Sequence, residues 1–455
     1  MGKGRLREGK RGLSRRRFLG SAAAATAFAV VPAHVLGGSG KTAPSEKLNI
    51  AGIGLGKRGP RDLAECAKHA HVGALCDVDE KHLTREGKKY PGAAQYTDYR
   101  RMLEEMAGSI DGVIVTTPHH SHAVISMAAL KEGIPVYCET PIARSVWEAR
   151  KLARAAEEAG VVTQMGDQGA SSDGIRLVTE WIQAGAIGEV REVHCYLESW
   201  PIWPQGKLEK PEKPVPDGLD WDLWQAPVEA RPYSPAYTLS GAYSDPHWRA
   251  WWDFGTGCLG DMAAHAMDPP FWALDLKAPV AVEAASTEVY EETAPEASVV
   301  RFEFPARNGR SPVTLYWYDG HMKPARPVEM EAGRSLRPNA VLFVGEDGCL
   351  ECDAWSGDPI LIPVSRMKDF EQPPHSFPRV RGTHQQNWLR AIKEEEAATC
   401  DFATVGGPLS EIAALGNVAL RTGRRIEWDA ENMKVTNVPE ANRYVRPNYR
   451  EGWSL

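Results

Sequence analysis

A stretch close to residue 50 constrains the fold of this chain more than any other part of the sequence. The apolar run 48–53 meets the glycine-rich turn GLGKRG (54–59), after which a helical pattern begins. A second apolar run then ends in Asp77, 23 residues after Gly54. A strand, a glycine turn, a helix and a second strand closed by a carboxylate form the arrangement that binds dinucleotides, so we expect a Rossmann fold here.

The three glycines of the turn have separate physical roles. Gly54 permits the tight turn, Gly56 lets the backbone approach a pyrophosphate, and Gly59 lets helix and strand pack closely. The N-terminus of the helix that follows attracts the phosphates.

The side chains around this turn bear on which dinucleotide is bound. Asp77 can accept hydrogen bonds from a ribose diol, and its charge repels a 2′-phosphate, so the sequence favours NAD. Lys57 and Arg58 in the turn are basic and leave NADP as the alternative.

Strand-like and helix-like segments continue to alternate beyond the turn. Strands are predicted at 112–118, 134–140 and 161–166, with helices at about 121–132 and 146–159 between them. This order predicts a parallel, doubly wound sheet, in which ligands lie beyond the carboxyl ends of the strands. The loops at those ends supply the remaining candidate cofactor-binding residues: Thr117, Pro118, His119, His122, Glu139, Thr140 and Gln168.

The sequence predicts neither a metal site nor a disulfide framework. The run HHSH (119–122) is expected to line the cofactor cleft, because no fourth metal ligand is evident. The eight cysteines are dispersed along the chain. Cys349 and Cys352 form a lone pair whose side chains would point to opposite faces of a strand.

The C-terminal part alternates strand signals at 298–304, 313–320 and 340–355 with turn residues, which predicts an antiparallel sheet. The segments 384–392 and 409–423 read as amphipathic helices that pack the chain back toward the first domain. We therefore expect an α/β protein with a Rossmann domain at 46–168 and a second domain at 169–455.

The first residues predict an export signal. Residues 1–36 combine a basic start with a modestly apolar, alanine-rich run, and SRRRFL (14–19) resembles the twin-arginine consensus. This predicts a periplasmic or otherwise exported protein that uses the twin-arginine machinery, with no membrane span. Without residues 1–36 the chain has 45 basic and 59 acidic side chains, a formal charge of −14, so nucleic acid and anionic membranes are poor partners.

Beyond these patterns, the mature chain resembles the Gfo/Idh/MocA family of NAD(P)-dependent, mainly sugar-handling oxidoreductases, in its exported twin-arginine form. The resemblance rests on these stretches: IGLGKRG (53–59), CDVD (76–79), YTDYRRML (96–103), TTPHHSHA (116–123), YCETPIA (137–143), QMGDQG (164–169), the segment 251–274, HQQNWLRAI (384–392) and LGNVALRTG (415–423). It implies a Rossmann domain followed by an α/β domain with an open, mostly antiparallel sheet. The outer face of that sheet would serve in a homo-oligomer.

Family chemistry is hydride transfer between a carbohydrate carbon and nicotinamide, assisted by the lysine of a Glu-Lys-Pro motif and by Asp and His on a helix of the second domain. Asp261 and His265 match that pair, and on a helix they share a face one turn apart. The resemblance implies that His265 is the general base, while Asp261 fixes its tautomer or helps to hold the substrate.

Thr140 stands where the family has lysine, between the expected Glu139 and Pro141. Threonine supplies no cation, although its hydroxyl could orient the reacting group. Three hypotheses follow: a sugar or polyol dehydrogenase that relies on His265, a glycosidase or lyase that recycles tightly bound NAD through transient oxidation and elimination, and a catalytically weak nucleotide-binding relative.

The tryptophans bear on the substrate, because aromatic faces suit sugar rings. They gather in 199–204, 220–227 and 247–252, and more than half are expected to fill the core. Trp248 and Trp251 are the candidates for the cleft, and Arg249 could bind a substrate carboxylate or form a structural ion pair.

Overall fold

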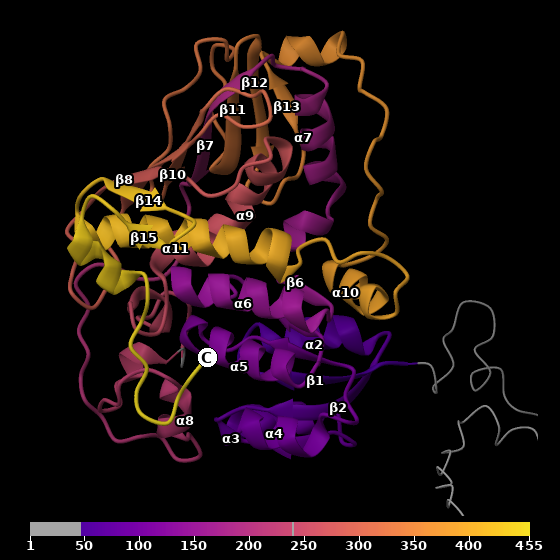
Figure 1. Cartoon of the computed structure of the whole chain (residues 1–455), viewed down its shortest axis with the longest axis vertical. Helices are drawn as coiled ribbons and strands as arrows, with labels where there is room; N and C mark the ends of the chain where they lie inside the picture. The colour runs from indigo at the N-terminus through magenta and orange to yellow at the C-terminus, as the bar shows by residue number, and fades with distance from the viewer. Residues whose placement is uncertain (1–46, 239–240) are drawn as a thin grey trace, which may run out of the picture. The chain divides into compact units, whose positions relative to one another are not determined.

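The N-terminal half forms a six-stranded sheet from the alternating elements that the sequence predicts (Figure 1). The computed structural model describes residues 47–238 and 241–455, so the export signal at 1–36 lies outside the described residues. The strands are β1 (Asn49–Ile53), β2 (His71–Cys76), β3 (Ala94–Tyr96), β4 (Gly112–Val115), β5 (Val136–Cys138) and β6 (Thr163–Met165). The helices between them are α2 (Gly59–Ala67), α3 (Glu80–Gly87), α4 (Tyr99–Met106), α5 (His119–Lys131) and α6 (Val146–Ala159).

All neighbouring strands of this sheet run parallel, in the order β3-β2-β1-β4-β5-β6. Alternate side chains of β4 enter different cores: Val113 and Val115 pack on one side, and Ile114 packs on the other. Both faces of a parallel sheet are covered in this way, which is why the central strand β4 is apolar and buried along its whole length. The predicted doubly wound Rossmann sheet is confirmed.

The second half is built on a nine-stranded sheet in the order β13-β12-β11-β7-β10-β9-β8-β14-β15. Its strands are β7 (Val190–Leu197), β8 (Ala281–Ser286), β9 (Ser298–Phe304), β10 (Val313–Tyr318), β11 (Asn339–Gly345), β12 (Gly348–Asp353), β13 (Ile360–Ile362), β14 (Ile426–Asp429) and β15 (Lys434–Val435). Only β7 and β10 pair in parallel, so the predicted open, mostly antiparallel sheet is confirmed.

The helices of the second half fall into two groups. They are α7 (Asp173–Gln183), α8 (Trp221–Gln225), α9 (Gly257–Ala273), α10 (His384–Ile392) and α11 (Gly407–Thr422), with short turns at η2 (Gln168–Ser171), η3 (Pro235–Tyr237), η4 (Trp248–Ala250), η5 (Val364–Lys368), η6 (Phe402–Gly406) and η7 (Pro439–Tyr444). Helices α8 and α10 lie by the Rossmann half, whereas α9 and α11 pack on the nine-stranded sheet with α7 behind them (Figure 1). Strand β10 alternates buried and half-buried side chains, because only one of its faces meets these helices.

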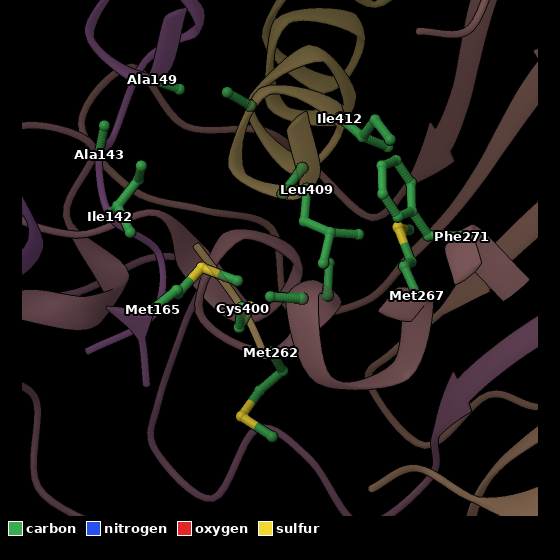
Figure 2. Packing of buried hydrophobic residues seen from close by; sticks show 14 of the residues in the cluster. Ile142, Ala143, Ala149, Met165, Met262, Met267, Phe271, Cys400, Leu409 and Ile412 are labelled. Atoms are coloured by element: carbon green, nitrogen blue, oxygen red, sulfur yellow. The ribbon is translucent and has the colours of Figure 1, made fainter. Parts of the chain in front are cut away.

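Two late helices pack on the first half, as the sequence predicts. Helix α11 lies beside α6 and α9, and α10 lies against α2 (Figure 1). The fully buried Trp388 of α10 packs directly over Gly112 at the start of β4. Figure 2 shows part of the core at this junction, where Met165 follows the Rossmann strands, Met262 comes from α9 and Leu409 comes from α11.

The cysteines and the helices carry no sign of cross-links or of membrane insertion. All eight cysteines are free and buried. Cys349 and Cys352 point into two different cores, as expected for residues on opposite faces of β12. Among the described helices, none has the length and apolar character needed to cross a membrane.

Candidate active site

The glycine turn after β1 has the geometry that its sequence predicts. Gly54 has φ +87°, and a Cβ there would lie 2.7 Å from the backbone nitrogen of Thr117. A Cβ on Gly59 would lie 2.0 Å from the carbonyl oxygen of Gly54. Gly56 differs, because the nearest atom to its Cβ position is His82 Cε1 at 3.9 Å. The backbone at Gly56 therefore borders open space, as a pyrophosphate cradle requires.

Asp77 is held in place at the end of β2. Its Oδ2 accepts a hydrogen bond from the Leu55 N–H at 2.5 Å and lies 3.2 Å from His82 Nδ1. Its Oδ1 accepts one hydrogen bond, from the Asp79 N–H at 2.9 Å. A carboxylate oxygen has two lone pairs, so Oδ1 can accept a further hydrogen bond from a ribose hydroxyl.

Two basic residues of α3 lie beside this carboxylate, and the sequence reasoning missed both. Burial alone would lower the pKa of His82, but the hydrogen bond and charge of Asp77 raise it above its ordinary value. Arg85 donates hydrogen bonds to the carbonyls of Leu55 and Gly56. These residues lie five and eight positions after Asp77 on a helix next to the turn, and this spacing could have indicated that they lie near the cofactor site.

The two basic residues of the turn itself have other partners. Lys57 Nζ donates to the Gly241 carbonyl at 2.6 Å and lies 4.7 Å from the centre of the Tyr243 ring. Arg58 pairs with Asp62 at 2.9 Å and with Glu139 at 3.1 Å. Arg58 is thus neutralised by two carboxylates, which weakens the case for NADP at this residue, whereas Lys57 keeps its charge and further N–H donors.

Glu139 belongs to a buried polar cluster under the glycine turn. Its Oε1 accepts hydrogen bonds from the Tyr137 hydroxyl at 3.1 Å and from Gln168 Nε2 at 3.2 Å, in addition to Arg58. Burial raises the pKa of Glu139 and of Asp62, and Arg58 opposes both shifts. The cluster thus links the loop after β5 to the turn after β1.

The histidines of HHSH (119–122) form hydrogen bonds that connect loops within the protein. His119 Nδ1 meets Thr256 Oγ1 at 2.9 Å, and its Nε2 meets Asp261 at 3.1 Å. The ring nitrogens of His122 lie 2.8 and 2.6 Å from the carbonyl oxygens of Pro141 and Thr117. The ring nitrogens of both histidines thus face atoms of the protein, and contact of these residues with a cofactor stays a prediction.

Burial lowers the pKa of His120 to about 3 and that of His122 to about 4, which keeps both rings neutral. Within the described ranges, no three His, Cys, Asp or Glu side chains are grouped so that they could hold a metal ion. Pro118 forms the N-cap position of α5, and Thr117 Oγ1 accepts a hydrogen bond from Ser121 at 2.7 Å.

Thr140 is buried and joined to α9. Its Oγ1 donates to the backbone carbonyl of Asp261 at 3.1 Å. Because a hydroxyl has one proton, Thr140 can accept a further hydrogen bond but has no proton left to donate to a ligand. The peptide bond between Thr140 and Pro141 is cis.

Asp261 and His265 share a face of α9, but their side chains bind different partners. Asp261 Oδ1 accepts hydrogen bonds from Arg249 Nε at 2.9 Å and from His119 Nε2 at 3.1 Å. Burial works to raise the pKa of Asp261, yet the charge of Arg249 holds it well below its usual range. The prediction that Asp261 fixes the tautomer of His265 is wrong.

The partner of His265 is Asp167, which follows β6 and which the sequence reasoning did not single out. His265 Nδ1 donates to Asp167 Oδ1 at 2.9 Å. In the part of the chain that the structure describes, His265 Nε2 has no hydrogen bond, so this nitrogen carries a free lone pair. The sequence could have indicated Asp167, because it is the one carboxylate in QMGDQG (164–169) and stands next to Gln168, a predicted cofactor-binding residue.

Of the aromatic candidates, only Trp248 lies at the site. Its ring packs edge-on against His119 at 4.6 Å and under the Arg249 guanidinium at 4.2 Å. Trp251 is 2% exposed and its indole N–H donates to the Ala236 carbonyl at 2.9 Å. A ring enclosed on all sides cannot stack on a sugar, so the prediction for Trp251 is wrong.

These contacts bring three loop ends to one helix. His119 follows β4, Thr140 follows β5 and Asp167 follows β6, and all three touch Asp261 or His265 of α9. The carboxyl ends of three consecutive strands of the sheet thus meet beside His265, whose Nε2 has no hydrogen bond within the described residues. The arrangement places a proton acceptor at the ligand-binding edge of a dinucleotide fold.

Comparison with known proteins gives a consistent result. Residues 48–167 match the family model described as oxidoreductase family, NAD-binding Rossmann fold, and residues 181–306 match its C-terminal alpha/beta domain. An inositol 2-dehydrogenase from Arthrobacter is 31% identical over 119 residues, 26% of this chain and 35% of the relative. A levoglucosan dehydrogenase from Pseudarthrobacter phenanthrenivorans is 28% identical over 113 residues, 25% of this chain and 28% of the relative.

Solved structures share the fold over a longer span. A WlbA dehydrogenase from Bordetella pertussis, in complex with NADH and UDP-GlcNAcA, has a TM-score of 0.56 at 16% identity, over 84% of this chain and 99% of that one. A levoglucosan dehydrogenase in complex with NADH and levoglucosan has a TM-score of 0.57 at 17% identity, over 84% and 99%.

The sequence matches to the curated relatives thus span less than half of those proteins. Both halves nevertheless match the models of one family, and the turn, the carboxylate after β2 and the helix with Asp261 and His265 are in place. The chain belongs to the Gfo/Idh/MocA family of oxidoreductases, with an NAD-binding Rossmann domain.

Proposed function

We propose that this protein is an NAD-dependent dehydrogenase that oxidises a hydroxyl group of a sugar, a polyol or a sugar derivative. The observation that carries the proposal is His265, whose Nδ1 is fixed by Asp167 at 2.9 Å while its Nε2 is left with a free lone pair. A neutral imidazole held in this tautomer is suited to accept a hydroxyl proton.

The residues of the Rossmann half fit NAD. Open space beside Gly56, the free lone pair of Asp77 and the N-terminus of α2 meet the needs of the pyrophosphate and of a ribose diol. NAD, when bound, supplies the acceptor for the hydride of the substrate carbon. The carboxylate of Asp77 opposes a 2′-phosphate, so we propose NAD as the cofactor.

The side chains of α9 and η4 would handle the substrate. His265 takes the hydroxyl proton, and Asp167 stabilises the imidazolium that forms. Arg249, neutralised by Asp261 and packed on Trp248, has a buried Nη1 without a hydrogen-bond partner. This N–H group is available to bind a substrate oxygen and brings a cation close to where the family has its lysine.

The test uses the relatives' substrates as probes. Purified protein is mixed with NAD and with inositol, levoglucosan or a wider polyol panel, and NADH is followed by absorbance. His265→Ala is expected to abolish turnover while NAD binding stays as in wild type, and His375→Ala, at an exposed position, serves as the matched control. Unchanged turnover in His265→Ala would instead favour a binding protein that has lost catalysis.

A recycled-NAD glycosidase or lyase is the second candidate, because the segment that follows β7 contacts both the glycine turn and the loop after β2. Leu219 forms a β-bridge with Asp79 beside Asp77, and Gly241 accepts the hydrogen bond of Lys57. A cofactor under such contacts would exchange slowly. Mass analysis of nucleotide released from the denatured protein separates the candidates: retained NAD, together with aglycone release without NADH formation, supports recycling.

We also propose export and self-association. Export rests on the segment SRRRFL (14–19), and a fusion of residues 1–46 to a reporter would show whether it directs transport through the twin-arginine route. Self-association rests on half-buried outer-face side chains of the large sheet, including Tyr316 and Tyr318. Light scattering on the purified protein measures the mass, and a monomer would contradict it.

A further inference from the structure

Two carboxyl groups lie behind His265, and only one of them touches it. Asp167 is fully buried, and Asp268, three residues after His265 on α9, is 3% exposed. The two side chains are within hydrogen-bond reach of one another. Oδ2 of Asp167 and Oδ2 of Asp268 are both buried without a partner.

These two orphaned oxygens have a common explanation. Two ionised carboxylates in contact would repel one another, and each would lose its hydration without compensation. A single proton between them converts the repulsion into a hydrogen bond and satisfies both atoms. Burial and the neighbouring Asp167 raise the pKa of Asp268 well above its ordinary value, in agreement with a pair that carries one proton and a net charge of −1.

Among the groups around the pair, Arg176 offsets part of its charge: it works to lower the pKa of Asp268, but burial and the charge of Asp167 outweigh it. Arg176 of α7 donates its hydrogen bonds to the backbone carbonyls of Ala170, Ser172 and Pro378. Burial raises the pKa of the Cys400 thiol and lowers that of His384 to about 4, so both stay uncharged. Asp401 faces away, since its carboxylate accepts the N–H groups of residues 403 and 404.

Asp268 also borders a cavity of about 380 Å³, which is shared with Arg176, Asp275, Lys277 and Asp401. The side chains of Asp275 and Lys277 are 41% and 49% exposed, so the cavity is open to solvent. A cavity of this size that is open to solvent and bordered by several charged side chains holds water. His265, Asp167, Asp268 and this cavity therefore form an unbroken series from the free Nε2 to bulk solvent.

We propose that Asp167 and Asp268 form a proton relay that carries the proton taken up by His265 into this cavity. The inference rests on the proposed function, because it concerns the proton released when a hydroxyl is oxidised. The substrate O–H proton moves to His265 Nε2, and the Nδ1 proton moves to Asp167 Oδ1. The proton shared by the pair then leaves from Asp268 to water in the cavity, so one proton enters at Nε2 and one leaves at Asp268, and the pair again holds one proton. His265 is left neutral with its proton on Nε2, and a flip of the ring returns an N–H to Asp167 and a free nitrogen to the substrate side.

The first experiment looks for the shared proton in the resting protein, without substrate. Infrared difference spectra of wild type minus Asp268→Asn are expected to show the C=O stretch of one protonated carboxyl at neutral pH. Asp167→Asn removes the other carboxylate of the pair, and it must abolish the same band. Asp275→Asn, at an exposed position in the cavity, must leave it. Absence of the band in wild type would overturn the proposal.

The second experiment measures transfer itself. In protein labelled with ¹⁵N-histidine, solvent exchange of the His265 Nδ1 proton is followed by NMR. Asp268→Asn keeps the net charge of the pair at −1 and donates to Asp167, but it cannot pass a proton on. We expect exchange to slow by about a hundredfold, and Asp275→Asn to match wild type. Equal exchange in Asp268→Asn and wild type would overturn the relay.

Neither measurement needs turnover, so the two proposals can fail separately. Suppose that the shared proton is found and the Nδ1 proton exchanges fast, but the protein oxidises no polyol. This result would support the relay and contradict the proposed dehydrogenase. If a polyol is oxidised, Asp268→Asn should lower kcat and leave KM unchanged, because Asp268 does not border the substrate-binding side of His265.

Discussion

A substitution at Gly56 can separate the effect on cofactor binding from the effect on folding, because there is open space where its Cβ would lie. In Gly56→Ala the new Cβ would meet nothing closer than His82 Cε1 at 3.9 Å, an ordinary contact, and the backbone is not in the left-handed region. The substitution removes conformational freedom from the unfolded chain, so we expect the free energy of unfolding to stay equal or to rise by about 0.4–1 kcal/mol.

NAD binding should respond very differently. The methyl group would stand where the pyrophosphate has to approach the backbone, and it would lengthen at least one hydrogen bond to a charged oxygen. Such a bond contributes about 1.5–3 kcal/mol. At 1.4 kcal/mol for each factor of ten, the Kd for NAD should rise by about 10- to 150-fold.

Isothermal titration with NAD and chemical unfolding in its absence measure the two quantities. Gly92→Ala is the control, because a Cβ there has no atom within 4 Å and lies far from the turn. Gly54→Ala is the opposite case: with φ +87° and a contact of 2.7 Å to Thr117, it should lower stability by several kcal/mol. An unchanged Kd in a stable Gly56→Ala protein would refute the position assigned to the pyrophosphate.

Three further predictions follow from buried charges and packing. The folded-state pKa of Asp268 is raised, so its stabilising contribution is complete below the unfolded pKa of about 3.9 and is lost as the pH rises. Above pH 4 the free energy of unfolding of Asp268→Asn should therefore rise relative to that of wild type, by up to about 1.4 kcal/mol per pH unit. Urea unfolding at several pH values measures this difference. Arg249→Met leaves Asp261 without its cation, so the pKa of Asp261 should rise toward its ordinary range, which a pH series of ¹³C-aspartate spectra would detect; a pKa still well below that range would contradict the ion pair. Trp388→Ala should cost about 3–5 kcal/mol of unfolding free energy, because the ring is fully buried over β4, and a loss below 1 kcal/mol would contradict that packing.

The fold could be predicted well because its signals are local. The apolar runs and glycines define β1 and the turn, and α6 has both ends marked in the sequence, by Ser145 as N-cap and by Gly160 in the left-handed conformation. The alternation in 298–304 and 313–320 likewise reports that one face of each strand is buried. The order of the nine strands depends on contacts between distant segments, which no local pattern records.

The site was predicted less completely, and for the same reason. Spacing on α9 correctly placed Asp261 and His265 on one face, but the partner of each came from elsewhere: Arg249 from η4 and Asp167 from the end of β6. His119 and His122 belong to a motif that suggests a binding site, and their ring nitrogens instead face atoms of the protein's own loops. Residue type and position along the chain do not reveal whether a polar atom still has a free lone pair.

The threonine in the family's lysine position now has a physical context. A lysine there would carry a cation between the loop after β5 and α9, whereas Thr140 makes a neutral hydrogen bond to the Asp261 carbonyl and so holds α9 directly. The positive charge of the region comes instead from Arg249, which is bound to the side chain of the same Asp261. Asp261 thus accepts the hydrogen bond of Thr140 through its backbone carbonyl and binds Arg249 through its carboxylate. The proposed proton acceptor, His265, lies one turn away and is bound to a different carboxylate, Asp167. Under the proposed function, the cation and the proton acceptor are therefore held by two separate carboxylates, a division that a single lysine would not need.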